Sequence, residues 1–219
     1  LNPLIVITSR GSQMRILSVA AHSDDNQIGC GGILSQFVER GDSVKAVYTS
    51  GYEKESVAPS LKVLGIDDFE VLDLEFERQY KRLEILIGRI DEVIEAFQPE
   101  IVFTHRPEGD LMIDHSVTGR AVRDVSIAHG LGWRGRVYFF EINQCCQGFR
   151  PDIYIQVDKE HWSKKLESIN ALSTYTQRHR ELMISATEAK GKTRGLECGI
   201  DYAECLARFS PRSLSFSIL

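Results

Sequence analysis

Apolar and polar positions follow two different rhythms along residues 15–171 of the chain. Short apolar runs rich in β-branched side chains predict buried strands at 15–21, 43–50, 69–74 and 100–105. Between these runs, apolar residues recur every three or four positions, which predicts helices at 31–41, 55–65, 81–97 and 114–130. Strands and helices are therefore expected to alternate along this part of the chain.

Local signals set several of the expected boundaries. Gly41 is suited to end the first helix, and Pro99 stops the third. Asp114 is a candidate N-cap for the fourth helix, because its carboxylate can accept hydrogen bonds from the first turn. Pro59 must lie in the first turn of the second helix or break it, because proline has no backbone N–H.

Alternation of strands and helices favours parallel pairing with right-handed crossovers. The predicted fold class is therefore α/β, with a Rossmann-like open, mostly parallel sheet and helices on both faces. We expect a single domain over residues 14–219. Residues 1–13 are expected to be an N-terminal extension, either a cloning remnant or an extra strand.

Composition narrows the class of protein. The 219 residues are 42% hydrophobic and 26% charged, which is ordinary for a globular protein, and no apolar run is long enough to span a bilayer. A net charge of −5 with scattered basic residues argues against a nucleic-acid partner. Five cysteines without a C-x-x-C pair suggest neither a disulfide framework nor a thiolate zinc site, so we expect a cytoplasmic location; the first residues also lack the features of a secretory signal.

Charged side chains gather where two predicted strands end. "SVAAHSDDNQIGCGG" places His22 and Asp25 after the first strand, and His115 begins the helix that follows strand 100–105. The carboxyl ends of neighbouring parallel strands lie at one edge of a sheet, where α/β proteins bind ligands. Two histidines, one carboxylate and an open position are what a catalytic zinc ion uses, although iron(II) or cobalt would also suit these ligands. Asp24, directed elsewhere, is then the candidate base that accepts a proton from water.

Simpler interpretations stay open for these residues. "HSDD" also fits a solvated turn in which Ser23 or Asp25 caps the next helix. Gly29, Gly31 and Gly32 suggest a close backbone turn that frees the helix N-terminus for an anionic or polar group, but their spacing matches neither dinucleotide nor phosphate loops. The remaining histidines are expected to be satisfied surface residues, namely His129, His161 and His179.

Taken together, these motifs resemble the PIG-L/LmbE family of zinc-dependent N-acetylglucosaminyl deacetylases. The family signatures are A-H-P-D-D followed by a Gly-Gly pair, and a D-x-H-x-D-H-like run. Further segments follow in family order from Arg15 onward, namely "GDSVKAVYTSG", "LKVLGI", "QPEIVFTH", "FRPDIYIQVD", "KKLESINALSTYTQ" and "GLECGIDYAECL".

The resemblance implies a role for each matching residue. It makes His22, Asp25 and His115 the metal ligands and Asp24 the general base. Asp114 takes the place of a family aspartate that helps to order the site. Arg78 sits where related sequences place a basic residue, which implies a substrate contact, although a solvated arginine near a helix start fits equally well.

Two positions depart from the family pattern. Ser23 replaces the usual proline, which loosens the backbone of the ligand loop but removes no chemical group. Met112 stands where many members carry a histidine thought to stabilise the oxyanion, and methionine cannot donate a hydrogen bond. His105 is the nearest substitute donor, and a structural role at the sheet edge is its alternative.

The expected function is hydrolysis of the N-acetyl group of an N-acetylglucosamine-type amino sugar or its conjugate. The expected partner is a small N-acetylated sugar, with a homo-oligomer as a further option. Two alternatives stay open, a hydrolase of another N-acyl amide and a non-catalytic sugar-binding or metal-binding relative.

Overall fold

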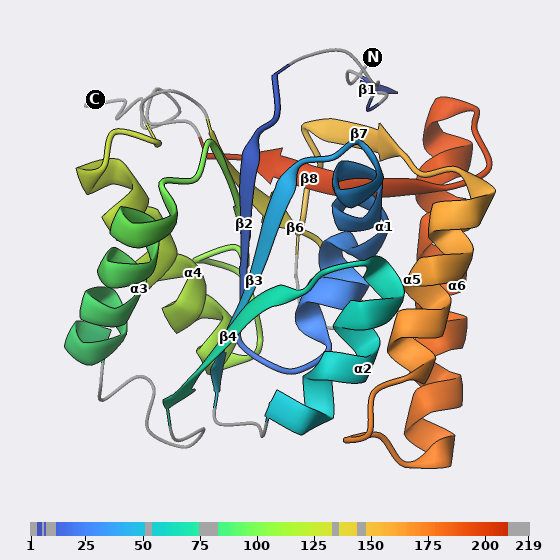
Figure 1. Ribbon diagram of the computed structural model, residues 1–219. Coiled ribbons are helices and arrows are strands. Elements are labelled where there is room, and N and C mark those ends of the chain that lie inside the picture. The colour runs from blue at the N-terminus through green and yellow to red at the C-terminus, as the bar shows by residue number, and fades with distance from the viewer. Residues whose placement is uncertain are drawn as a thin grey trace.

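A computed structural model describes residues 4–5, 7, 12–50, 54–74, 83–132, 136–143 and 148–209 (Figure 1). In chain order, its elements are β1 (Leu4–Ile5), β2 (Arg15–Ala20), α1 (Asp25–Glu39), β3 (Ser43–Ser50), α2 (Lys54–Leu64), β4 (Asp68–Leu74), α3 (Leu83–Phe97), β5 (Ile101–Thr104), α4 (Ile113–Ala128), β6 (Val137–Phe140), β7 (Ile153–Gln156), α5 (Lys159–Asn170), α6 (Gln177–Cys198) and β8 (Ala203–Arg208).

The strands form one 8-stranded sheet in the order β1-β7-β8-β6-β5-β2-β3-β4. Neighbouring strands are parallel except for β8, which runs antiparallel to both β6 and β7. The predicted fold class, an open and mostly parallel α/β sheet, is confirmed. The N-terminal extension contributes to the sheet, because β1 pairs in parallel with β7 at its edge.

Helices cover both faces of the sheet, as Figure 1 shows. Helices α3 and α4 lie on one face, and α1, α2, α5 and α6 lie on the other. Side chains of the central strand β2 alternate between the two cores: Ile16 and Ala20 pack in the first, while Leu17 and Val19 pack in the second. This alternation explains why β2 is apolar at nearly every position.

Three predicted boundaries are wrong in detail. Helix α1 begins at Asp25 rather than at residue 31, and its N-cap, Asp24, makes no side-chain cap hydrogen bond. Helix α4 begins at Ile113 with Met112 as its N-cap, so Asp114 lies inside the first turn. Pro59 lies in the interior of α2, which continues past it without a break.

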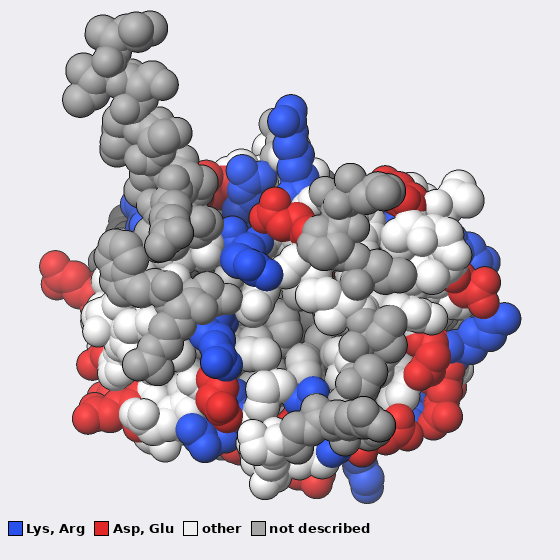
Figure 2. All heavy atoms as spheres, turned by 90° about the horizontal axis from the view of Figure 1, so that it is seen from above, with Lys and Arg blue, Asp and Glu red and all other residues white. Residues whose placement is uncertain are grey.

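The strands β2, β3 and β5 end at the lower end of the molecule in Figure 1, and the turns into α1 and α4 lie there. Figure 2 looks onto the opposite end, where basic and acidic side chains lie among one another. None of the helices in the described part of the chain combines the length and apolar character that a membrane span requires.

Candidate metal centre

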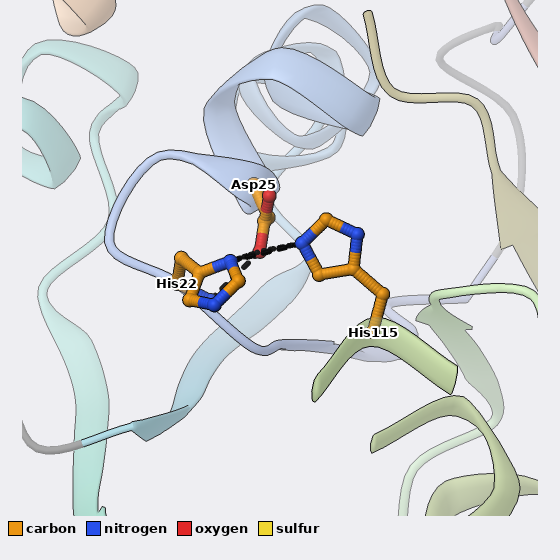
Figure 3. A group of neighbouring side chains, drawn as sticks. All are labelled: His22, Asp25 and His115. Atoms are coloured by element: carbon orange, nitrogen blue, oxygen red, sulfur yellow. Dashed lines mark hydrogen bonds and ion pairs between the residues drawn. The ribbon is translucent and has the colours of Figure 1, made fainter. Parts of the chain in front are cut away.

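Two strand ends bring three buried side chains together. His22 follows β2, Asp25 is the first residue of α1, and His115 lies in the first turn of α4. Nδ1 of His22 lies 2.9 Å from Nε2 of His115. Oδ2 of Asp25 lies 3.3 Å from the first nitrogen and 3.4 Å from the second. Figure 3 shows both imidazoles turned toward one point beside the carboxylate, so the predicted ligand set forms one cluster.

Each histidine of the cluster has a carboxylate behind it. Nε2 of His22 lies 3.4 Å from Oδ2 of Asp114, and Nδ1 of His115 lies 3.0 Å from Oδ2 of Asp110. When a metal ion is bound, the ring nitrogens that face Asp114 and Asp110 would keep their protons, and the opposite nitrogen of each ring would hold the ion. Metal-binding histidines in proteins are held in this way. The donor set therefore fits a divalent metal ion bound by two imidazoles and one carboxylate.

Asp110 had no role in the sequence interpretation. Its second oxygen accepts a hydrogen bond from the backbone N–H of Met112 at 2.9 Å, which fixes the carboxylate at the start of α4. The available signal was its place as the first residue of the run from 110 to 115, five positions before His115. Asp114, expected to order the site, contacts His22 rather than the neighbouring His115.

The carboxylates make the cluster attractive to cations. Burial opposes a charge on His22, but hydrogen bonds with Asp114 and Asp25 raise its pKa to about 9. Burial likewise opposes a charge on His115, but the charge of Asp25 and the hydrogen bond with Asp110 raise its pKa to about 10. Positive charge is thus stabilised at this point, so a metal ion that binds here must displace protons.

His105 lies against the cluster, with its Nε2 3.1 Å from Oδ2 of Asp25. Its side chain is 1% exposed, and its Nε2 accepts a hydrogen bond from the backbone N–H of Ala21 at 3.0 Å. The ring stacks on His115 with centroids 4.1 Å apart and meets the edge of Phe140. Burial and the charge of His115 lower the pKa of His105 to about 4. These contacts favour the structural alternative for His105, and its role as an oxyanion donor stays a prediction.

Asp24, next to the ligand Asp25, contacts a residue to which the sequence assigned no role. The phenol of Tyr175 donates a hydrogen bond to Oδ2 of Asp24. The backbone N–H of Asp24 itself also interacts with this carboxylate. Burial and the adjacent charge of Asp25 raise the pKa of Asp24. Asp24 is not among the three side chains of the cluster, and its role as the base stays a prediction.

Helix α1 has a break at Cys30, whose backbone angles are φ −150° and ψ 20°. The break leaves backbone N–H groups without helical partners, and the buried carboxylate of Glu204 in β8 accepts hydrogen bonds from Gly32 at 3.0 Å and Ile33 at 2.8 Å. The anionic group expected at a freed helix N-terminus is therefore the protein's own Glu204. The half of α1 after the break corresponds to the helix predicted from residue 31.

The glycines of this segment allow close packing. A Cβ on Gly29 would lie 2.4 Å from the ring of Phe140, and one on Gly32 would lie 2.7 Å from Val157. Helix α1 can therefore approach the sheet closely in front of the cluster. The change in backbone direction that the glycines predicted corresponds to the break at Cys30, between Gly29 and Gly31.

Other predicted residues have varied positions. Met112 is 36% exposed, beside the cluster. Arg78 lies outside the described residues, so its contact with the substrate stays a prediction. His161 is buried, 2.8 Å from Asp158, and is not the surface residue that we expected.

A scan against protein-family models matches residues 17–126 to PIG-L, GlcNAc-PI de-N-acetylase. The chain belongs to the PIG-L family. The matched residues include the ligand loop and the start of α4, and thus all three members of the cluster. Membership identifies the chain as a hydrolytic N-deacetylase of a metal-dependent kind, and the predicted family and reaction class are confirmed.

Individual relatives share the fold of this PIG-L family member. The uncharacterized deacetylase YaiS of Escherichia coli (strain K12) is 25% identical over 179 residues, which are 75% of this chain and 93% of YaiS. The N,N'-diacetylchitobiose deacetylase of Pyrococcus horikoshii has a TM-score of 0.73 at 16% identity over 90% of this chain and 84% of that one. GalB, the 4-carboxy-2-hydroxymuconate hydratase of Pseudomonas putida KT2440, has a TM-score of 0.76 at 22% identity over 91% and 98%.

Proposed function

We propose that this chain hydrolyses the acetamide of an N-acetylglucosamine-type amino sugar, free or carried on a conjugate, with a zinc ion held by His22, Asp25 and His115. The observation that carries the proposal is the buried two-histidine, one-carboxylate cluster at the strand ends of a PIG-L family member. Iron(II) or cobalt would suit the same donors. The free thiols of Cys30, Cys198 and Cys205 support the expected cytoplasmic location.

The chemistry follows from the two neighbouring aspartates. When bound, the metal ion supplies Lewis acidity, which makes water a stronger acid and a carbonyl carbon a better electrophile. Oδ1 of Asp24 accepts a proton from the attacking water, whose oxygen bonds to the acetamide carbon. Asp24 then returns the proton to the nitrogen as the C–N bond breaks. Acetate and a free amino sugar result.

The experiment measures acetate release from a panel of N-acetylated sugars, nucleotide sugars and lipid-linked sugars, with metal content determined on the same preparation. The Asp24→Asn variant should keep its metal and its fold but lose most of the activity, because an amide cannot accept the proton. An Asp24→Asn variant as fast as the parent would overturn the assigned base.

The same panel separates the alternatives. Cleavage of longer N-acyl amides without acetate release would indicate a hydrolase of another amide. Since GalB is a hydratase with the same fold, the panel also includes an unsaturated carboxylic acid, and addition of water to that compound alone would replace the deacetylase proposal. Sugar binding without turnover in the metal-loaded protein would indicate a non-catalytic relative.

A further inference from the structure

Two adjacent side chains of the ligand loop contact two adjacent side chains far along the chain. Oγ of Ser23 lies 3.2 Å from Oγ1 of Thr174, and Asp24 accepts the hydrogen bond of Tyr175; both pairs are 151 positions apart. Thr174 and Tyr175 lie in the connection between α5 and α6. Figure 1 places this connection at the lower end of the molecule, the same end as the turn from β2 into α1.

The connection holds Tyr175 from its own side. A guanidinium nitrogen of Arg180 in α6 donates hydrogen bonds to the backbone carbonyls of Leu172 at 3.0 Å and Tyr175 at 3.3 Å. The Tyr175 ring also stacks on His179, with centroids 4.4 Å apart and an angle of 14° between the planes. The hydrogen bonds of Arg180 hold the backbone at Tyr175, and the stacking on His179 restricts the ring. The phenol that contacts Asp24 is therefore held in place.

This contact gives the two oxygens of the Asp24 carboxylate different surroundings. Tyr175 engages Oδ2, and no side chain of the described residues is hydrogen-bonded to Oδ1. A carboxylate with one oxygen anchored cannot rotate freely, so its other oxygen points in a constant direction. Asp24 gains no such anchor from its own helix, since it makes no side-chain cap hydrogen bond at the start of α1.

We propose that Tyr175 is a positioning residue for Asp24, holding Oδ2 so that Oδ1 is aimed at the attacking water. The inference rests on the proposed function, in which Asp24 is the base. Ser23 adds to it: where the family has proline, this chain has a hydroxyl that contacts Thr174 and ties the same two segments together. The anchor therefore joins the N-terminal ligand loop to a C-terminal segment outside the family match of residues 17–126.

The test compares Tyr175→Phe with the parent enzyme in its metal-loaded form. Loss of a hydrogen bond to a charged group at the reaction centre should lower kcat about ten-fold or more, with KM and metal content unchanged. Tyr202→Phe is the matched control, because the Tyr202 phenol also donates to a carboxylate, that of Glu188 at 2.9 Å, away from the cluster. This control should keep the parent kcat.

A double variant shows whether Tyr175 acts through Asp24. In an Asp24→Asn background, Tyr175→Phe should cause no further loss of kcat, because the group that it positions has lost its function. A further loss by the same factor would overturn the inference. A parent-like kcat in Tyr175→Phe would also overturn the inference. The same holds if a rise in KM or a loss of metal accounts for the lower activity of Tyr175→Phe. If Asp24→Asn itself keeps full activity, the proposed function fails instead, and the two failures are distinguishable.

Discussion

Nδ1 of His22 and Nε2 of His115 face each other at 2.9 Å, although the residues lie 93 positions apart in the chain. Both nitrogens lie beside Oδ2 of Asp25, and the outer nitrogens of the two rings face Asp114 and Asp110. Two imidazole nitrogens that face each other beside a carboxylate are stabilised when a proton or a metal ion lies between them. The arrangement of these side chains therefore favours the binding of a positively charged metal ion.

The first prediction concerns the three ligands. His22→Ala, Asp25→Ala or His115→Ala should strip bound metal from a folded protein, because two remaining ligands hold zinc poorly. Metal content after dialysis and the circular dichroism spectrum provide the measurements. His129→Ala is the control, since His129 pairs with Asp91 on the surface at 2.7 Å and should keep full occupancy. Full occupancy in all three ligand variants would contradict the ligand assignment.

The second prediction concerns the carboxylates behind the histidines. Asp110→Asn and Asp114→Asn should each weaken metal affinity about 10-fold to 100-fold, because the imidazoles lose the groups that orient them. Competition with a chelator measures the affinity. Asp124→Asn is the control on the same helix α4, where the exposed Asp124 pairs with its neighbour Arg123 at 2.7 Å.

The effect should also follow the pairing seen in the structure. In a His115→Ala background, Asp110→Asn should weaken the residual affinity little, because Asp110 acts on that ring. Asp114→Asn should keep its effect in this background, since it contacts His22. Equal effects of both substitutions in both backgrounds would mean that the carboxylates act through overall charge alone.

The sequence predicts much of the fold because its signals there are local. Strands β2 to β5 and helices α1 to α4 were predicted with shifts of a few residues at their ends, except that α1 extends six residues further toward its N-terminus. Periodicity could not reveal that early start, because the turn before Cys30 is separated from the rest of α1 by a backbone break that Glu204 caps from β8. The antiparallel direction of β8 also depends on distant partners.

In the candidate site, too, some residues could be predicted from local sequence signals and others could not. His22, Asp25 and His115 were predicted because strand ends of a parallel sheet meet at one edge. The contact of Tyr175 with Asp24 was not predicted, because a hydrogen bond between residues 151 positions apart leaves no local pattern in the sequence. The His105 prediction relied on nearness alone, which cannot distinguish a donor to the substrate from a buried ring that packs on His115.

The third prediction concerns the support of α1. Lys165 in α5 is 2% exposed, donates to the Ile28 carbonyl at 2.7 Å and forms an ion pair with Glu204. Lys165→Met should lower the free energy of unfolding by about 3 to 5 kcal/mol, because it leaves the buried Glu204 charge without its partner. Chemical denaturation measures the change. Lys164→Met, next in the chain and paired with Glu160 on the surface, should cost less than about 1 kcal/mol, and equal costs would contradict the interpretation.

The last prediction concerns Met112, the departure that most affects the chemistry. If an oxyanion donor is missing, Met112→His should raise turnover on a good substrate about ten-fold, because a donor aimed at the developing charge acts mainly in the transition state. His105→Ala tests the substitute donor. Since His105 is buried and accepts a hydrogen bond from the Ala21 N–H, we expect His105→Ala to lose thermal stability. Any fall in its kcat should be no larger than its loss of bound metal explains. A specific fall in kcat at full metal occupancy would instead make His105 the donor, and unchanged turnover in Met112→His would then follow from redundancy.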